Sequence, residues 1–234
     1  MLENFKFNKK FGQNFIFDNN LLNAIVSDSQ ISKNTEVLEI GAGAGTLTKI
    51  IAQSCKKIIS YEIDENLKDI LNNNLKEINN SKIIFKDALK TNINEIEKDF
   101  SGNYSIVANL PYYITTPLIF KFIEETKKVD SITIMIQKEV ADRLVAKSGK
   151  DYGTISIILD FVGEVKFCRK VSRTMFTPAP NVDSAVVRIE LNRNKYNANF
   201  EDFCKVVRTA FSMRRKTLLN NFSSGLNMSD NVTT

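Results

Sequence analysis

The stretch TEVLEIGAGAGTLT, residues 35–48, joins a short apolar run to a turn with three glycines and then to an amphipathic segment. Similar apolar runs alternate with amphipathic stretches as far as residue 136, at KIISYEI (57–63), KIIF (82–85), YSIVANL (104–110) and SITIMI (131–136). Short β-branched runs separated by helical periods are typical of βαβ units. The pattern therefore predicts an α/β fold with a doubly wound, mostly parallel sheet.

The rest of the chain adds further helical and β-like segments to this sheet. We predict a charged helix at QKEVADRLVAK (137–147), a helix or strand at TISIILDFV (154–162), and β-like runs at EVKFCRKV (164–171) and DSAVVRIEL (183–191). The two prolines of SRTMFTPAPN (172–181) exclude a helix between the last two runs and indicate an ordered loop. Helical periods return from residue 199 onward, which predicts a main domain over residues 1–192 and a small helical domain over 193–234.

Composition excludes several kinds of chemistry. The 234 residues contain no histidine, which removes Ser-His-Asp and Cys-His catalysis and the common histidine zinc motifs. Cys55, Cys168 and Cys204 form no C-x-x-C pair and are odd in number, so we predict free thiols and no metal site. No apolar run is long enough to cross a bilayer, and the first residues do not resemble a signal peptide, so a cytoplasmic location is expected.

Positive charge is concentrated in the last third of the chain. Residues 1–160 carry 20 Lys and Arg against 21 Asp and Glu, whereas residues 161–234 carry 12 against 6. This asymmetry favours a polyanion as the partner of the C-terminal part. The alternative is an ordinary lysine-rich surface.

The glycine turn and two acids predict a pocket for an adenosine. Gly41 and Gly43 allow the backbone to approach a ligand at the start of a helix. Glu62 ends the next predicted strand, where a carboxylate can accept both ribose hydroxyls, and Asp87 follows the third, where it can accept from the adenine amino group. Each feature alone has an ordinary structural explanation, as a tight turn, a solvated strand end or a helix cap.

Two adenosine-containing ligands fit such a pocket, NAD and S-adenosylmethionine. The G-x-G-x-G spacing departs from the dinucleotide fingerprint, and Glu39 stands before the glycines, where its carboxylate could meet the ammonium of a methionine moiety. The same charge would repel a pyrophosphate. The methyl donor S-adenosylmethionine is therefore favoured.

The stretch VANLPYYITTP, residues 107–117, ends the fourth predicted strand at the same edge of the sheet. Its Asn-Leu-Pro-Tyr sequence resembles the Asn-x-Pro-Tyr motif of the N6-adenine methyltransferases. Other blocks in order over residues 9–225 resemble the small-subunit ribosomal RNA adenine dimethyltransferases of the KsgA type: KKFGQNFIFD, EIGAGAGTLT, YEID, KDAL, NLPYYITTP, QKEVADRL, DYGTISI, FTPAPNVDSAV and RTAFSMRRKTLLNN.

This resemblance implies a Rossmann-like methyltransferase fold with a seven-stranded sheet, helices on both faces and a small C-terminal helical domain. Its activity would be dimethylation of N6 on two adjacent adenosines in the 3′-terminal hairpin of small-subunit rRNA. The implied methyl donor is S-adenosylmethionine, without a metal, and the implied partner is an immature small subunit. Members of the family commonly act as monomers.

The family also implies which residues handle the target base. The Asn109 side-chain oxygen and the Leu110 carbonyl would accept the hydrogens of the adenine amine, and Pro111 would keep that carbonyl rigid. Tyr112 and Phe176 would stack on the two faces of the base. Tyr113 has no such support and is assigned to packing.

Donor and RNA contacts are implied in the same way. The donor set is Gln13, Asn14, Phe15, Glu39, Gly41, Gly43, Glu62, Ile63, Asp87, Ala88 and Asn109. The RNA set is Lys170, Arg173, Arg208, Arg214, Arg215 and Lys216. For some of the arginines, pairing with Glu201 or Asp202 is the alternative.

The chain departs from the family at one point, and two kinds of rival function remain. Only 43 residues follow DSAVVRIEL, fewer than the family usually carries, so we expect a truncated helical domain with weakened ribosome docking. The rival enzyme is the large-subunit rRNA dimethyltransferase that confers macrolide resistance. The rival from another class is a non-catalytic RNA-binding or assembly factor, or a mitochondrial transcription factor of the same fold.

Overall fold

A sheet with strand order β4-β3-β2-β5-β6-β9-β7 forms the centre of the protein in the computed structural model, which describes residues 12–213 and 215–225. Its strands are β2 (Glu36–Ile40), β3 (Lys57–Glu62), β4 (Ser81–Phe85), β5 (Tyr104–Asn109), β6 (Val129–Gln137), β7 (Gly163–Val171) and β9 (Ser184–Leu191). The five strands from β4 to β6 are mutually parallel, and β9 is antiparallel to both of its neighbours. This confirms the predicted seven-stranded, mostly parallel sheet.

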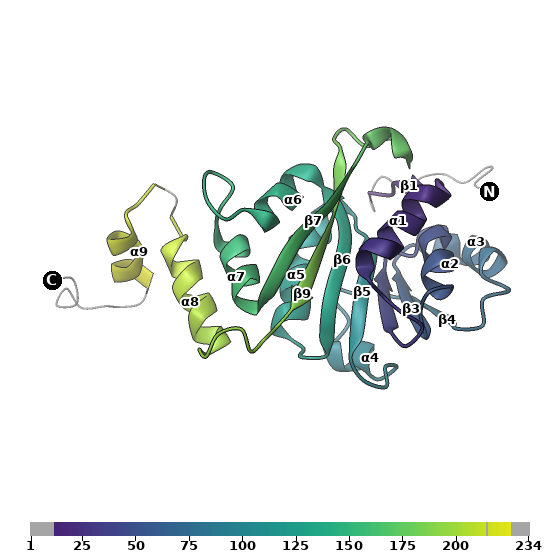
Figure 1. Cartoon of the computed structure of the whole chain (residues 1–234), viewed down its shortest axis with the longest axis horizontal. Helices are drawn as coiled ribbons and strands as arrows, with labels where there is room; N and C mark the ends of the chain where they lie inside the picture. Colours follow the sequence, from purple (N-terminus) through teal and green to yellow (C-terminus); the bar gives the residue numbers. More distant parts are fainter. Residues whose placement is uncertain (1–11, 214, 226–234) are drawn as a thin grey trace.

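Helices cover both faces of the sheet, as Figure 1 shows. Side chains of α1 (Asn19–Ser29) and α2 (Thr46–Ala52) share one buried cluster with the strands. A second cluster, on the other face, contains side chains of α4 (Ile93–Glu97), α5 (Thr115–Glu124), α6 (Lys138–Val145) and α7 (Thr154–Val162). α3 (Lys68–Asn74) packs with Phe15 and the residues of the glycine turn.

Residues alternate between these two clusters along β2. Val37 belongs to the cluster on the α1 and α2 face, whereas Leu38 and Ile40 belong to the cluster on the opposite face. All five residues of β2 are buried, as expected for a central strand that is covered on both sides. Both faces of β2 therefore carry buried side chains, including those of Glu36 and Glu39.

A second, two-stranded sheet joins two distant segments of the chain. β1 (Phe15–Ile16) pairs in antiparallel fashion with β8 (Phe176–Thr177), so that Ile16 lies opposite Phe176. The loop that contains Phe176 is ordered, as predicted, and its Thr177–Pro178 peptide bond is cis. This pairing holds the N-terminal segment around Phe15 against the loop that contains Phe176.

The C-terminal helices α8 (Phe200–Ala210) and α9 (Leu218–Gly225) follow the last strand. α8 packs on α7, where Cys204 and Val207 contact Ile158, and the ring of Phe203 stacks on Phe161 with centroids 4.0 Å apart. In Figure 1 α9 lies beyond α8, on the side away from the sheet. Within the described residues, no helix is long and apolar enough to cross a membrane.

Candidate active site

A cavity opens at the carboxyl edge of the sheet, beside the ends of β2, β3, β4 and β5. The strand order reverses between β2 and β5, and ligands of α/β proteins bind at such switch points. Every predicted donor and target residue except Glu39 lines this cavity: Gln13, Asn14, Phe15, Gly41, Gly43, Glu62, Ile63, Asp87, Ala88, Asn109, Leu110, Pro111, Tyr112 and Phe176.

The glycine turn brings bare backbone to the cavity wall. Gly43 has a φ of +58°, and a Cβ at this position would lie 3.1 Å from Cε1 of Phe15. Its N–H donates to Oε2 of Glu62 at 2.8 Å. A side chain at residue 43 would therefore be strained and would separate the N-terminal segment from the turn.

Glu62 is held rigidly at the end of β3. Its Oε1 accepts hydrogen bonds from the N–H groups of Ile63 (2.8 Å) and Asp64 (2.9 Å), while Oε2 accepts from Gly43. Burial raises the pKa of Glu62, whereas these three backbone N–H groups lower it. A carboxylate has about four lone-pair sites, and three are occupied, so Glu62 keeps one acceptor site for a hydroxyl group in the cavity.

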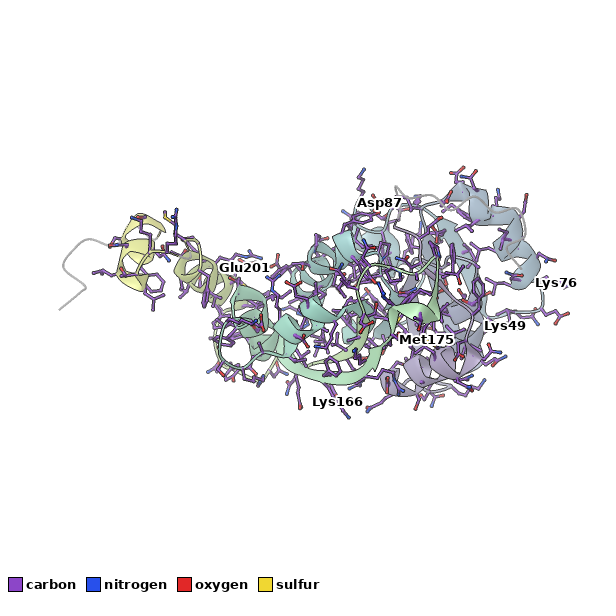
Figure 2. All side chains as sticks on the ribbon, turned by 90° about the horizontal axis from the view of Figure 1, so that it is seen from above. Lys49, Lys76, Asp87, Lys166, Met175 and Glu201 are labelled. Atoms are coloured by element: carbon purple, nitrogen blue, oxygen red, sulfur yellow. The ribbon has the colours of Figure 1, made fainter. Side chains whose placement is uncertain are left out.

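Asp87 forms a second acceptor after β4. Its Oδ1 accepts from the Leu89 N–H at 3.0 Å, and its Oδ2 lies 3.9 Å from Nζ of Lys90. The side chain is 28% exposed, so it reaches the cavity from a less buried position than Glu62 does. Figure 2 labels Asp87 in the larger part of the molecule, well separated from Glu201 on α8.

Glu39 is the one predicted donor residue that does not line this cavity. Its side chain is fully buried and is not part of the cavity wall, because the alternation along β2 directs it under α2. Its Oε2 accepts from the hydroxyls of Thr48 and Ser60, both at 2.6 Å. Burial raises the pKa of Glu39 to about 7. Through Oε2, Glu39 therefore ties α2 and β3 to β2, while its buried Oε1 has no hydrogen-bond partner among the described residues.

Asn109 and the residues after it form a fixed corner. The Nδ2 of Asn109 donates to the Asn14 carbonyl at 3.1 Å, which places its Oδ1 on the other side of the amide group. The Leu110 N–H donates to the Met135 carbonyl at 3.2 Å, and Pro111 has a φ of −56°. These contacts determine the direction of the Leu110–Pro111 segment.

The two predicted aromatic residues approach from different elements. Tyr112 lies in the short helix η3 (Tyr112–Ile114), and its hydroxyl lies 3.1 Å from Oγ of Ser184 on β9. Phe176 is only 5% exposed and packs in the cluster of the α1 and α2 face while also lining the cavity. Its place opposite Ile16 fixes it relative to the N-terminal segment.

Sequence reasoning gives no role to Tyr113, which lines the cavity, or to Asp64, which holds Gln13 of the cavity wall. Tyr113 was assigned to packing, yet it is 59% exposed and lines the cavity, because η3 turns it away from the core. Asp64 is 2% exposed and accepts a hydrogen bond from Nε2 of Gln13 at 2.6 Å. The sequence feature that could identify Asp64 is its place as the last residue of the YEID stretch.

The predicted RNA contacts divide into paired and exposed residues. Lys170 pairs with Asp183 at 2.8 Å. Arg208 pairs with Glu124 of α5, not with Glu201 or Asp202, and its guanidinium lies 5.3 Å from the Phe120 ring centroid. Arg208 therefore helps to fasten α8 to the main body.

The remaining basic residues differ in their surroundings. The backbone N–H of Arg173 donates to Asp183 at 3.0 Å, and its side chain lines a separate polar hollow with Lys138 and Asn181. Arg215 and Lys216 are exposed between α8 and α9. Arg214 lies outside the described residues.

Comparison with known proteins connects this geometry to a family. The family model for ribosomal RNA adenine dimethylases matches residues 4–232. The chain belongs to this family. It is therefore a methyltransferase, and both its family and its curated relatives support adenine dimethylation of ribosomal RNA as its activity.

Individual relatives agree with this assignment. The ribosomal RNA small subunit methyltransferase A of Clostridioides difficile (strain 630) is 44% identical over 222 residues, which cover 93% of this chain and 77% of the relative. The crystal structure of a dimethyladenosine transferase from Plasmodium falciparum has a TM-score of 0.79 at 30% identity, covering 92% of this chain and 77% of that one.

A more distant structure confirms the fold class. The 23S rRNA methyltransferase ErmE has a TM-score of 0.76 at 24% identity, covering 90% of this chain and 84% of that one. At this identity the likeness shows the fold alone. The fold is the Rossmann-like fold of S-adenosylmethionine-dependent methyltransferases, with additional helices at the C-terminal end.

Proposed function

We propose that the chain uses S-adenosylmethionine to dimethylate N6 of two adjacent adenosines in the 3′-terminal hairpin of small-subunit rRNA. Its substrate in the cell would be an immature small ribosomal subunit in the cytoplasm, which it would engage as a monomer. The names of the curated relatives at 44–46% identity support the small-subunit assignment. One observation carries the proposal: the adenosine acceptors and the Asn109 corner face the same cavity.

The acceptors on the donor side fit an adenosine. Glu62 would accept from a ribose hydroxyl, and Asp87 would accept from the adenine amino group, because both carboxylates offer oxygen atoms where the ligand carries donors. Ile63 and Ala88 would line the adenine. The bare backbone at Gly43 allows Phe15 to pack on the glycine turn beside the proposed donor, because a Cβ there would lie 3.1 Å from the Phe15 ring.

The methionine end of the donor would lie near the N-terminal segment. Gln13, Asn14 and Phe15 line the cavity beside the glycine turn. The amides of Gln13 and Asn14 would hydrogen-bond the amino-acid group of the donor. Since Glu39 is buried under α2, it is not part of this proposed contact.

The target amine would be held by the Asn109 corner. Its nitrogen is a weak nucleophile because the lone pair is delocalised into the purine ring. The Asn109 Oδ1 and the Leu110 carbonyl would accept its two hydrogens and aim the lone pair at the donor methyl group. The hydrogen bond from Asn109 to the Asn14 carbonyl supports this orientation of the amide.

The chemistry needs positioning more than proton transfer. S-adenosylmethionine supplies a methyl group on a positively charged sulfur. The amine nitrogen forms the new bond to carbon as the sulfur–carbon bond breaks, and the methylated amine then releases a proton to water. A chain without histidine can support this reaction.

The stacking and RNA contacts complete the proposal. Tyr112 and Phe176 would lie against the two faces of the extruded base, each contributing about 1–3 kcal/mol. Lys170, Arg173, Arg214, Arg215 and Lys216 would contact RNA phosphates. Arg208 would contribute less because Glu124 already neutralises it.

A methylation assay on two substrates tests the proposal. Purified protein is incubated with labelled donor and either immature small subunits or naked fragments of large-subunit rRNA, and dimethyladenosine is mapped by mass spectrometry. We expect modification of two adjacent adenosines near the 3′ end of the small-subunit rRNA only. Modification of the large-subunit fragment would favour the macrolide-resistance enzyme, and RNA binding without methylation would favour a non-catalytic factor.

A further inference from the structure

Tyr113 is the one tyrosine of the NLPYYITTP segment that the proposed reaction leaves without a role. It is 59% exposed and lines the same cavity as the proposed donor residues. Tyr112, the residue before it, has its hydroxyl 3.1 Å from Ser184 of β9. The two neighbouring rings therefore leave η3 in different directions.

The ring of Tyr113 lies beside Gly12, at the start of the described residues. A Cβ built at Gly12 would lie 3.8 Å from Cε1 and 3.9 Å from Cδ1 of Tyr113, so the ring edge packs beside the N-terminal segment. Burial raises the pKa of the Tyr113 hydroxyl, and the negative charges of Asp87 and Glu62 raise it further. These are the two acids that are proposed to hold the adenosine, and both line the cavity that Tyr113 lines.

We propose that Tyr113 is a donor-binding residue whose ring covers the adenosine of S-adenosylmethionine at the mouth of the cavity. This inference rests on the proposed function for the identity of the donor. The exposed ring offers an apolar face that a bound purine would remove from water. Within η3, Tyr112 would then contact the target base and Tyr113 would contact the donor.

Binding measurements with three ligands test this role. S-adenosylmethionine, S-adenosylhomocysteine and 5′-methylthioadenosine are titrated calorimetrically into the wild type, Tyr113→Ala and Tyr113→Phe. The third ligand lacks the amino-acid end, so it reports on the adenosine contact alone. We expect Tyr113→Ala to raise the Kd of all three ligands by roughly tenfold, and Tyr113→Phe to stay within about twofold of the wild type.

Kinetics provide an independent readout. With saturating RNA, Tyr113→Ala should raise the donor KM in the same ratio as the Kd and leave kcat within a few-fold. Tyr112→Ala should show the reverse pattern, with a lower kcat for RNA methylation and an unchanged donor Kd. Because Tyr113 is exposed, its variants should unfold at the wild-type temperature without ligand and gain less stability when donor is added.

Several outcomes would overturn the inference. Wild-type affinity of Tyr113→Ala for all three ligands would do so, as would equal losses in the Ala and Phe variants, or a loss for S-adenosylmethionine with none for 5′-methylthioadenosine. If the wild type itself bound none of these ligands, the proposed donor would be wrong, which is a different failure.

Discussion

Glu62 illustrates how one residue can prepare a binding site before the ligand arrives. Three backbone N–H groups, from Gly43, Ile63 and Asp64, hold its carboxylate at the cavity wall. These three bonds fix the direction in which its one remaining lone pair points. The residue then offers a preorganised acceptor, which reduces the ordering cost of binding.

We predict that Glu62→Gln weakens donor binding. The amide replaces one acceptor oxygen with an N–H₂ group that faces backbone donors. Because a hydrogen bond to a charged group contributes about 1.5–3 kcal/mol, this loss should be measurable. The Kd for S-adenosylhomocysteine should rise by roughly tenfold to a hundredfold in calorimetry. Glu65→Gln, an exposed change in the same segment, is the matched control and should bind as the wild type does.

Much of the site could be predicted residue by residue, because its members stand at the ends of strands. Glu62, Asp87 and Asn109 each follow an apolar run, and parallel strands bring such ends to one edge. Glu39 and Tyr113 could not be placed in this way. Their positions depend on which face of β2 a side chain occupies and on the rotation of η3, neither of which a motif specifies.

At the scale of elements, the sheet depends on a close approach between β7 and β9. Gly163 pairs with Leu191 at the end of these strands. A Cβ on Gly163 would lie 2.0 Å from the carbonyl oxygen of Glu190, well inside contact distance. Backbone atoms cannot move aside as a flexible side chain can.

We therefore predict that Gly163→Ala destabilises the protein. Forcing the two strands apart should lower the free energy of unfolding by about 1–3 kcal/mol, measured by urea denaturation. Gly102→Ala is the control, since nothing lies within 4 Å of a Cβ there. Equal stability of the two variants would show that β7 tolerates the displacement.

The buried carboxyl of Glu39 should give the free energy of unfolding an unusual pH dependence. In the unfolded chain this carboxyl ionises near pH 4.5, whereas in the folded protein burial raises its pKa to about 7. Between these values the folded state binds more protons, so the free energy of unfolding should fall as the pH rises. The chain contains no histidine, which leaves few other groups to titrate in this window.

Glu39→Gln should remove most of this slope. We expect the wild type to lose on the order of 2 kcal/mol between pH 5 and pH 8 and the variant to lose clearly less. Urea denaturation at the two pH values measures the difference. The pKa of Glu62 is also raised, so a smaller slope of the same sign should remain in both proteins. Identical slopes would contradict the account of Glu39.

Element types were more predictable than element pairings. Continuous apolar runs identified the central strands because both faces are covered. TISIILDFV remained open between helix and strand, and it forms α7, whose buried Ile155, Ile158 and Leu159 follow helical spacing. β1 and β8 are two residues long and pair across most of the chain, so no local pattern identified them.

At the scale of the whole molecule, the basic residues between α8 and α9 lie far from the glycine turn. Figure 1 places α8 and α9 at one end of the molecule and α2 and α3 at the other. RNA held by Arg215 and Lys216 would therefore extend along the protein to reach the cavity. Phosphate contacts of this kind set register and affinity without reading sequence.

We predict that the double variant Arg215→Ala, Lys216→Ala binds RNA more weakly and with less salt dependence. Removing two phosphate contacts should reduce the slope of log K against log salt by roughly one to two, measured by fluorescence anisotropy with the target hairpin. Donor affinity should be unchanged. Lys49→Ala with Lys76→Ala, at the opposite end in Figure 2, is the charge-matched control. Equal effects of both pairs would indicate non-specific attraction.

The most direct test of the whole account is the single-turnover methylation rate of Asn109→Ala, with saturating donor and RNA, beside the exposed control Asn34→Ala. If the Asn109 oxygen and the Leu110 carbonyl orient the target amine, losing the first should slow methyl transfer by roughly a hundredfold to a thousandfold. The control should keep the wild-type rate. An undiminished rate in Asn109→Ala would contradict the central claim.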